Sequence, residues 1–219
     1  MTEWATSDVP WKTDSILPAP PAGAVPVLHD REYRVESFLL ENGNLLIQGA
    51  LRDQKPPGMF VPGDPDPLTM HHMQVGLEIS LPDRMIVAVH TEFETYPHST
   101  CPSIIDHYDN LVGLSIARGF THKVRELFGG PRGCSHTTAL LQAMAPIAMQ
   151  SSKSVESIKA ERAGETNPLV SGERNPESWT YLTNTCHVWI EGGDRFNSID
   201  DDGHRAIPIA VRLKELGVD

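Results

Sequence analysis

The stretch at 128–144 holds the residues of this chain that are best suited to chemistry. A glycine-rich turn at 129–133 leads directly into Cys134, and Ser135 and Thr137 are suitable N-caps for a following helix. Unpaired N–H groups and the positive end of the helix dipole would favour the thiolate form of Cys134. A thiolate can bind a metal ion or act as a nucleophile. The competing interpretation is a small buried cysteine beside a tight turn.

Two residues far from Cys134 in the sequence complete a candidate metal site. Cys101 begins a predicted helix, and His71 begins a predicted strand with its side chain on the core face. When helices pack on one face of a sheet, the first residues of helices and strands at the same end can lie close together. One imidazole with two thiolates suits zinc or iron. We therefore expect one divalent metal ion, zinc or iron, bound by His71, Cys101 and Cys134.

Other side chains in the same region could move protons or hold a substrate. His136 lies in the first turn of the third predicted helix, where it would act as an acid or base or as a fourth metal ligand. His72 and Tyr96 are the other catalytic candidates. Arg132 and Gly133 could bind an anionic group of a substrate or cofactor at the helix start, or simply form a tight connection.

Hydrophobic periodicity predicts the strands that position these residues. Apolar-rich runs at 34–40 and 44–52, separated by Glu-Asn-Gly, predict a β-hairpin, and a proline-rich loop at 53–69 is predicted to be a flap. Alternation predicts two further strands, at 71–81 and 85–93. The inward face of the last strand is predicted to consist of Met85, Val87, Val89 and Phe93.

Helical spacing predicts three helices after these strands. They begin at about Cys101, Phe120 and Ser135. Strands grouped before helices indicate an α+β fold, in which an antiparallel sheet has its helices packed on one face. We expect a proline-rich N-terminal arm at 1–32 and a single α+β domain at 33–219.

The rest of the chain has weaker patterns. The third helix is expected to kink near Pro146, and residues 151–178 are predicted to form a polar loop. A short strand is predicted within 179–190, an acidic turn at 200–203, and a final amphipathic helix at 209–216.

Composition limits the classes of function. The 219 residues carry a formal net charge of −11, with 39% hydrophobic and 21% charged residues. This acidity argues against nucleic-acid binding, and no apolar run reaches membrane-spanning length. Three cysteines do not make a disulfide framework, so we expect a cytoplasmic protein with a small-molecule substrate. Trp4 and Trp11 would anchor the arm on the domain itself or on a second copy in a homo-oligomer.

Several short sequence motifs occur in order between residues 31 and 186: YRVE, LRDQKP, MHHM, CPSI, LVGLSIARGF, VRELFGG, GCSHTTALL and NTCHVW. In these motifs the segment resembles the bacterial proteins catalogued as domain of unknown function 2889. His72 stands where that family usually has an acidic residue. Members occur among bacterial pathways for plant-derived aromatic compounds. The resemblance therefore implies a lyase that acts on a lignin-derived phenolic substrate and releases a small aldehyde such as formaldehyde.

A second pattern concerns the cysteines. The run Phe93–Tyr96 stands before Cys101, Gly-Cys-Ser surrounds Cys134, and His71 begins a strand. In this spacing residues 71–150 are similar to the iron–sulfur scaffold fold of the NifU N-terminal type, with histidine in place of its first cysteine. This resemblance implies the alternative function, a metal or iron–sulfur carrier that is not an enzyme.

Catalysis without a metal, by Cys134 or a histidine, is the third possibility. The sequence contains no G-x-S-x-G, G-x-G-x-x-G or G-x-x-x-x-G-K-[ST] motif. Serine hydrolases with a nucleophile elbow, dinucleotide-binding proteins and P-loop proteins therefore lack support.

Overall fold

The computed structural model of the chain describes residues 16–24, 29–81, 83–117, 119–165, 182–194 and 207–217. It divides into two compact units, Met1–Lys153 and Ser154–Asp219, each of which is described by itself. The first unit contains the sheet and the candidate site. Within the described ranges no helix combines the length and the apolar character needed to cross a membrane. The expected division into an arm and one domain stays a prediction, and Trp4 and Trp11 lie outside the described residues.

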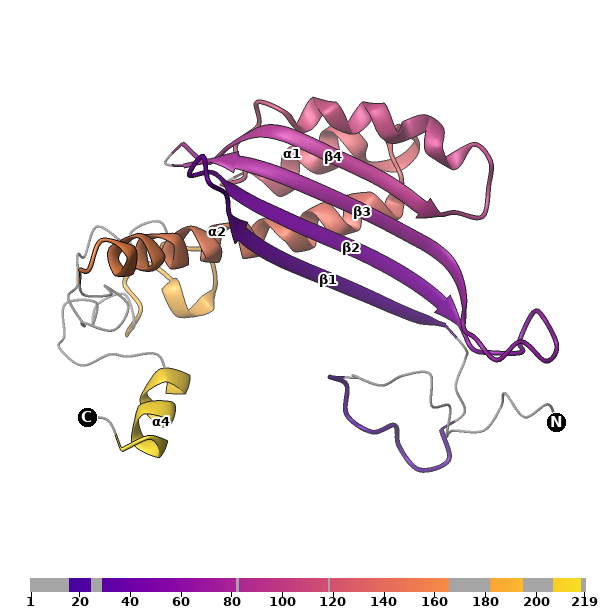
Figure 1. Cartoon of the computed structure of the whole chain (residues 1–219), viewed down its shortest axis with the longest axis horizontal. Coiled ribbons are helices and arrows are strands. Elements are labelled where there is room, and N and C mark those ends of the chain that lie inside the picture. Colours follow the sequence, from indigo (N-terminus) through magenta and orange to yellow (C-terminus); the bar gives the residue numbers. More distant parts are fainter. Residues whose placement is uncertain are drawn as a thin grey trace. The chain divides into compact units, whose positions relative to one another are not determined.

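The first unit is built on a four-stranded antiparallel sheet in which the strand order follows the chain order (Figure 1). Its strands are β1 (Asp30–Leu39), β2 (Leu45–Lys55), β3 (Leu68–Ser80) and β4 (Met85–Thr95). The predicted hairpin and the two predicted long strands are thus confirmed. However, β1 starts earlier and β2 ends later than their apolar runs, so the loop that follows β2 is shorter than expected.

The turn between β1 and β2 explains why Asn-Gly was a reliable signal. Gly43 has a φ of 84°, a left-handed conformation that costs glycine little. The Gly43 N–H donates to the Leu40 carbonyl at 3.0 Å, and the Leu40 N–H donates to the Asn44 carbonyl at 2.9 Å. The Asn42 side chain accepts a further hydrogen bond from the Asn44 N–H at 3.0 Å. This turn sets the register of β1 against β2.

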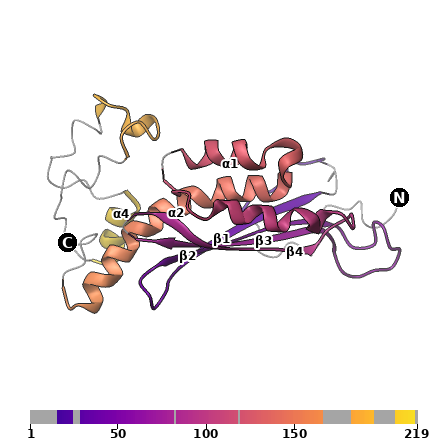
Figure 2. The ribbon, with the colours of Figure 1, turned by 90° about the horizontal axis from the view of Figure 1, so that it is seen from above.

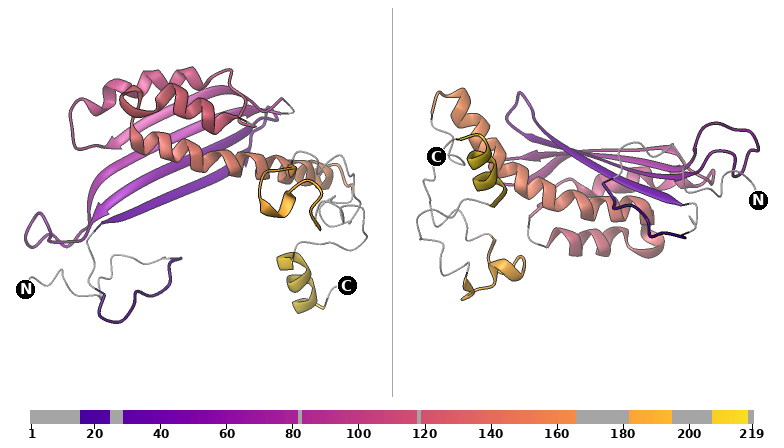
Figure 3. Two further views of the ribbon diagram at one scale, coloured as in Figure 1. Left: turned by 180° about the vertical axis from the view of Figure 1, so that it is seen from behind. Right: turned by 90° about the horizontal axis from the view of Figure 1, so that it is seen from below.

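Helices cover one face of the sheet, which confirms the predicted α+β fold (Figures 2 and 3). These elements are the 3-10 helix η2 (Cys101–Leu111), α1 (Phe120–Phe128), the short 3-10 helix η3 (Gly130–Arg132) and α2 (Ser135–Arg162), of which the part up to Lys153 belongs to the first unit. The second unit contains the 3-10 helix η5 (His187–Trp189) and α4 (Ile207–Glu215). The helix expected near the end of the chain is therefore present.

The core of the first unit lies between the sheet and the helices of that unit. From the sheet it contains Leu45, Ile47, Leu51, Met73, Val75, Leu77, Ile79, Ile86 and Phe93, and from the helices mainly Tyr108, Leu111, Phe120, Val124, Phe128, Leu140, Leu141 and Met144. The strand residues recur with a period of two, because alternate side chains of a strand face the same side. Gly49 continues the inward face of β2, and the side chains of Met144 and Leu140 of α2 pack directly against it.

The inward face of β4 differs from the prediction. The pairing of β3 with β4 shifts between Glu78 and Ile79, so that Ile79 pairs with Ile86. A bulge of this kind changes which alternate residues face the core. Ile86 is therefore buried, whereas Val87, which was predicted to face inward, is 45% exposed.

Two predictions for the later part of the chain were wrong. Residues 151–162 are not a loop, because α2 continues through Pro146 to Arg162. Three serines of its polar stretch, Ser151, Ser152 and Ser157, are buried, and Ser152 donates to the Ala148 carbonyl of the same helix at 2.9 Å. The strand expected within 179–190 is absent from its described part, which forms turns and η5. The acidic run at 200–203 lies outside the described residues.

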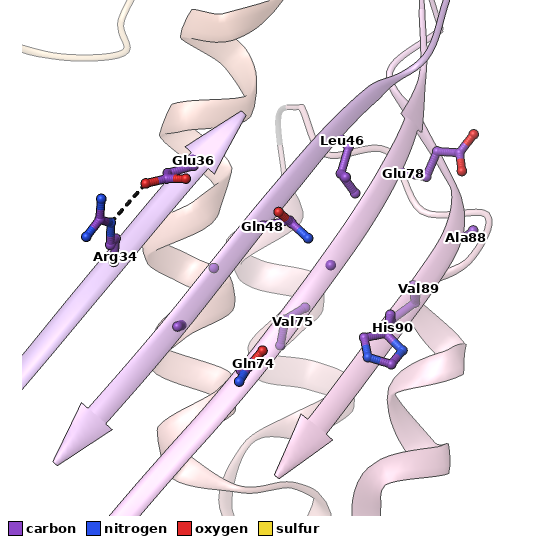
Figure 4. A pocket seen from close by; sticks show the side chains of 13 residues that line it. Arg34, Glu36, Leu46, Gln48, Gln74, Val75, Glu78, Ala88, Val89 and His90 are labelled. Atoms are coloured by element: carbon purple, nitrogen blue, oxygen red, sulfur yellow. Dashed lines mark hydrogen bonds and ion pairs between the residues drawn. The ribbon is translucent and has the colours of Figure 1, made fainter. Parts of the chain in front are cut away.

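The face of the sheet opposite the helices carries both polar and apolar side chains. A shallow hollow of about 680 Å³ lies on it, with Gln48, Gln74 and His90 among its lining residues (Figure 4). Gly76 and Ala50, which have no side chain or only a methyl group, are among its lining residues. None of the sequence-predicted site residues lines this hollow.

We predict that alanine substitutions at Gly49 and Gly76, on opposite faces of the sheet, have opposite effects. A β-carbon at Gly49 would lie 2.7 Å from Met144 Sδ, whereas one at Gly76 would lie 3.7 Å from His90 Cβ. Gly49→Ala should lower the free energy of unfolding by about 1–3 kcal/mol through overpacking. Gly76→Ala should leave it unchanged or raise it by about 0.5 kcal/mol. Urea denaturation measures both, and equal effects would contradict the packing described.

Candidate metal centre

The candidate site begins as a row of side chains across three neighbouring strands. Arg31 of β1 pairs with Asp53 of β2, and Asp53 pairs with His71 of β3. These residues follow the alternation that buries Leu51 and Met73, so they lie on the helix-covered face of the sheet. Directly opposed side chains of an antiparallel pair have β-carbons only about 5 Å apart. The strand register alone therefore brings the three polar groups together.

Asp53 is the centre of this row. Its side chain is 0% exposed, and the Arg31 Nε and Nη2 atoms donate to Oδ1 and Oδ2, both at 2.6 Å. Burial raises the pKa of Asp53, but the hydrogen bonds and charge of Arg31, with smaller contributions from His136 and His29, outweigh it and hold that pKa below its ordinary value. The carboxylate therefore stays ionised although no part of it reaches water.

Two imidazoles lie against this carboxylate. His71 Nδ1 is 3.1 Å from Asp53 Oδ2, and His136 Nε2 is 3.5 Å from the same oxygen. The two rings stack, with their centroids 4.0 Å apart. Burial lowers the pKa of both histidines, helped by His136 for His71 and by Arg31 for His136, and these effects outweigh the opposing charge of Asp53. Both rings are therefore neutral at neutral pH, the form that accepts a proton or binds a metal.

The start of α2 positions His136 and Cys134. The Tyr108 hydroxyl accepts a hydrogen bond from the Cys134 N–H at 2.8 Å and lies 3.4 Å from the Cys134 carbonyl, to which it donates. Tyr108 is itself fixed, because its ring is buried and stacks on Phe128. The Cys134 Sγ atom lies 3.6 Å from His136 Nδ1. Thus Tyr108 of η2 fixes the backbone of Cys134 directly before α2, and the first turn of α2 places His136 over the sheet.

Asp53, His71 and His136 form a group that could hold a metal ion. One ligand atom from each lies within 4.8 Å of the other two. Ligand atoms bonded to zinc at about 2.0–2.2 Å stand about 3.0–3.5 Å from one another, as the nitrogens of both histidines stand from Oδ2 at 3.1 and 3.5 Å. Two imidazoles and a carboxylate suit zinc or non-haem iron. Because stacked rings direct their lone pairs side by side, binding would require the rings to turn apart.

The predicted metal ligands are distributed as follows. His71 belongs to this group, and Cys134 adjoins it through His136 without contributing one of the three ligand atoms. Cys101 is the first residue of η2. At a rise of about 2 Å per residue it lies about 14 Å along the axis from Tyr108, which contacts Cys134. Binding of a metal by His71, Cys101 and Cys134 together stays a prediction.

The predicted catalytic residues also differ in position. His136 lies in the cluster, whereas His72 faces the opposite side of the sheet with its Nδ1 atom 2.8 Å from Glu94 Oε2. Tyr96 is exposed and directly follows β4. Of the three, the structure brings only His136 to Asp53.

Arg132 and Gly133 make the contacts of a tight connection between α1 and α2. The Arg132 Nε and Nη2 atoms donate to the carbonyls of Glu126 and Arg125 at the end of α1, at 2.9 and 3.3 Å. A β-carbon on Gly133 would lie 2.5 Å from the Phe128 carbonyl oxygen, so glycine is required there. The proposed binding of an anion by these two residues stays a prediction.

Sequence reasoning missed Arg31 and Asp53, which it had assigned to the arm and to the flap. The signal was present in the alternation of β2, because Asp53 continues the inward series of Ile47, Gly49 and Leu51. A carboxylate at the end of an apolar face requires a buried partner. Arg31 could then have been found by extending the hairpin register.

We predict that Asp53→Asn destabilises the protein, because it leaves Arg31 without its bidentate partner. The free energy of unfolding should fall by about 2 kcal/mol, less than for a fully buried pair because Arg31 is partly solvated. Glu36→Gln is the control, since it removes an exposed ion pair with Arg34 at 2.9 Å and should change stability by less than about 0.5 kcal/mol. A loss no larger than this control, measured by urea denaturation, would contradict a structural role for Asp53.

We also predict that acidification destabilises the metal-free protein in two stages. Because the native pKa values of His71 and His136 lie below their ordinary value of 6.5, the unfolded chain takes up protons first and stability falls as the pH drops below 6.5. Asp53 contributes stability above its ordinary pKa of 3.8, which is lost as the pH falls through its lower native value. Denaturation at pH 7.5 and 5.5 should show the first stage. A His71→Gln, His136→Gln double variant should show a smaller fall.

Comparison with known proteins identifies the family. The model of a family described as protein of unknown function (DUF2889) matches residues 29–150, more than half of the chain and the whole of the sheet and site. No curated protein matches. No solved structure matches either, so the similarity to the iron–sulfur scaffold fold gains no support. With Arg31, Asp53, His71 and His136 all inside the matched segment, the chain belongs to the DUF2889 family.

Proposed function

We propose that this protein is a small-molecule enzyme whose active centre is Asp53, His71 and His136 with one bound divalent metal ion. The observation that carries the proposal is one buried oxygen, Asp53 Oδ2, that faces two imidazole nitrogens at 3.1 and 3.5 Å. A structural ion pair would need Arg31 alone. Two neutral imidazoles gathered on one ionised carboxylate are the groups that metal binding and proton transfer use.

The chain's own residues have distinct roles in this proposal. A bound zinc or iron would polarise a substrate oxygen as a Lewis acid. Arg31 holds the Asp53 carboxylate in one orientation, and Asp53 in turn orients His71 through Nδ1. Without a metal, His71 can donate its Nδ1–H to Asp53, which leaves its Nε2 as a proton acceptor; a metal bound through Nδ1 would take the place of this hydrogen. His136 lies beside it and can take the same role from the start of α2.

The reaction class that we propose is a lyase step that releases formaldehyde or a similar aldehyde from a lignin-derived phenolic substrate. The support is the resemblance to bacterial proteins of aromatic catabolism, together with a neutral imidazole suited to general-base catalysis. A basic group of the site that is not bound to the metal takes the proton of a primary hydroxyl, and the adjacent carbon–carbon bond breaks. The electron pair of the broken carbon–carbon bond stays on the larger fragment, which then receives a proton, so the cleavage is redox-neutral.

A second candidate function is metal-free covalent catalysis by Cys134. Its Sγ atom lies 3.6 Å from His136 Nδ1, and the other nitrogen of that ring lies 3.5 Å from Asp53 Oδ2. Thiol, imidazole and carboxylate in this order are the arrangement of an activated cysteine nucleophile. The two candidates compete for His136 Nε2, because the ring cannot bind a metal and rest against Asp53 through the same nitrogen.

We predict that protein purified without a histidine tag contains about one zinc or iron ion per chain by elemental analysis. His71→Gln and His136→Gln should each remove most of the metal, because each leaves only two ligands. His90→Gln, at an exposed histidine of β4, is the matched control and should retain it. Cys101→Ser and Cys134→Ser should also retain it. Loss of metal from the cysteine variants but not from His136→Gln would instead support the set of His71 and two thiolates.

The reaction class is tested with a lignin-derived dimer that carries a hydroxymethyl group, with formaldehyde release as the readout. His71→Gln should lower kcat by about 10²–10⁴-fold, because it removes most of the metal together with one imidazole, and a chelator should abolish turnover. Turnover that survives the chelator but is lost in Cys134→Ser would support the cysteine mechanism. Bound metal without turnover would support a carrier, and absence of both would overturn the proposal.

A further inference from the structure

Two further basic side chains, His29 and Lys55, lie in a row beside the Asp53 cluster. Lys55, the last residue of β2, has its Nζ atom 3.1 Å from His29 Nδ1. His29 Nε2 lies 3.8 Å from Asp53 Oδ1. The His29 ring thus lies between the Lys55 ammonium and the carboxylate that Arg31 already holds. Neither His29 nor Lys55 is part of the group that could bind a metal.

The charges of this region do not balance. Arg31 and Lys55 carry two positive charges, and Asp53 carries one negative charge. Among the described residues Lys55 has an imidazole as its partner, not a carboxylate. Among Arg31, Lys55 and Asp53 alone, one positive charge is therefore left over, in a chain whose formal net charge is −11. A local excess of the opposite sign in an acidic protein attracts anions.

Exposure determines which charge a ligand would meet first. The side chains of His29 and Arg31 are 46% and 34% exposed, whereas the Asp53 side chain is 0% exposed. A molecule that arrives from solvent therefore meets hydrogen-bond donors of Lys55, His29 and Arg31, and the carboxylate is screened behind them. The loop after Lys55 adds exposed apolar side chains, Phe60 and Val61.

We propose that Lys55, His29 and Arg31 form a subsite for a carboxylate group of the substrate, whose apolar body faces the loop of Phe60. One excess positive charge matches a carboxylate monoanion better than a phosphate dianion. The ammonium and guanidinium donors provide charge-assisted hydrogen bonds to it. The proposal rests on the proposed function only in placing the reacting part of the substrate at Asp53, His71 and His136.

The experiment uses the full chain after removal of metal by a chelator and dialysis, so that a bound metal cannot attract the ligand. Benzoate is the probe, and benzyl alcohol is its uncharged counterpart. Calorimetric titration should show that benzoate binds and that benzyl alcohol binds at least about tenfold more weakly. Lys55→Gln should weaken benzoate binding about tenfold, and Lys55→Arg should largely restore it.

Lys123→Gln is the matched control, because Lys123 is an exposed lysine of α1 that pairs with Glu126 at 2.8 Å. Its affinity for benzoate should equal that of the unmodified protein. Circular dichroism verifies that each variant is folded. Equal binding of benzoate and benzyl alcohol, or unchanged benzoate binding in Lys55→Gln, overturns the subsite. Because the titration needs no metal, a negative result in elemental analysis would end the metal proposal and leave this one standing.

Discussion

The pairing of Arg31 with the buried Asp53 carboxylate is the interaction on which the rest of the site depends. An isolated carboxylate without contact to water would take up a proton, since desolvation disfavours the charged form. The two hydrogen bonds from Arg31 prevent this and fix both oxygens in space. The ionised carboxylate can then hold two neutral imidazoles whose positive forms are disfavoured by burial. Without the guanidinium, the cluster would be one neutral acid between two histidines.

Much of the fold was predictable because it follows from local patterns. The Asn-Gly turn, the alternation in β3 and the helical spacing after Cys101 each depend on residues close in sequence. The core-facing position of His71 followed from the same alternation. Asp53 was missed as a site residue because the predicted end of β2 was placed where its apolar residues end, and a charged residue was taken to mark a loop. Its true environment depends on Arg31, which lies more than twenty positions earlier and meets it only through the hairpin register.

The errors elsewhere have equally specific causes. Val87 was assigned to the core because a bulge between Glu78 and Ile79 leaves no local mark on the sequence. The polar continuation of α2 was taken for a loop because serine, lysine and glutamate occur in both. Cys101 was grouped with Cys134 because both begin helices, and that grouping stays a prediction.

The plain order of the sheet has a consequence for how the protein emerges during synthesis. Each strand of β1–β4 pairs with its neighbour in the chain, so the sheet is made entirely of short-range pairings, which form quickly. Arg31, Asp53 and His71 can therefore meet before the ribosome has produced α2. His136, in the first turn of α2, is added after these strands have paired. The strand register would bring three of the polar groups together first, and a nascent chain stalled before α2 would lack both His136 and the helix that covers this face of the sheet.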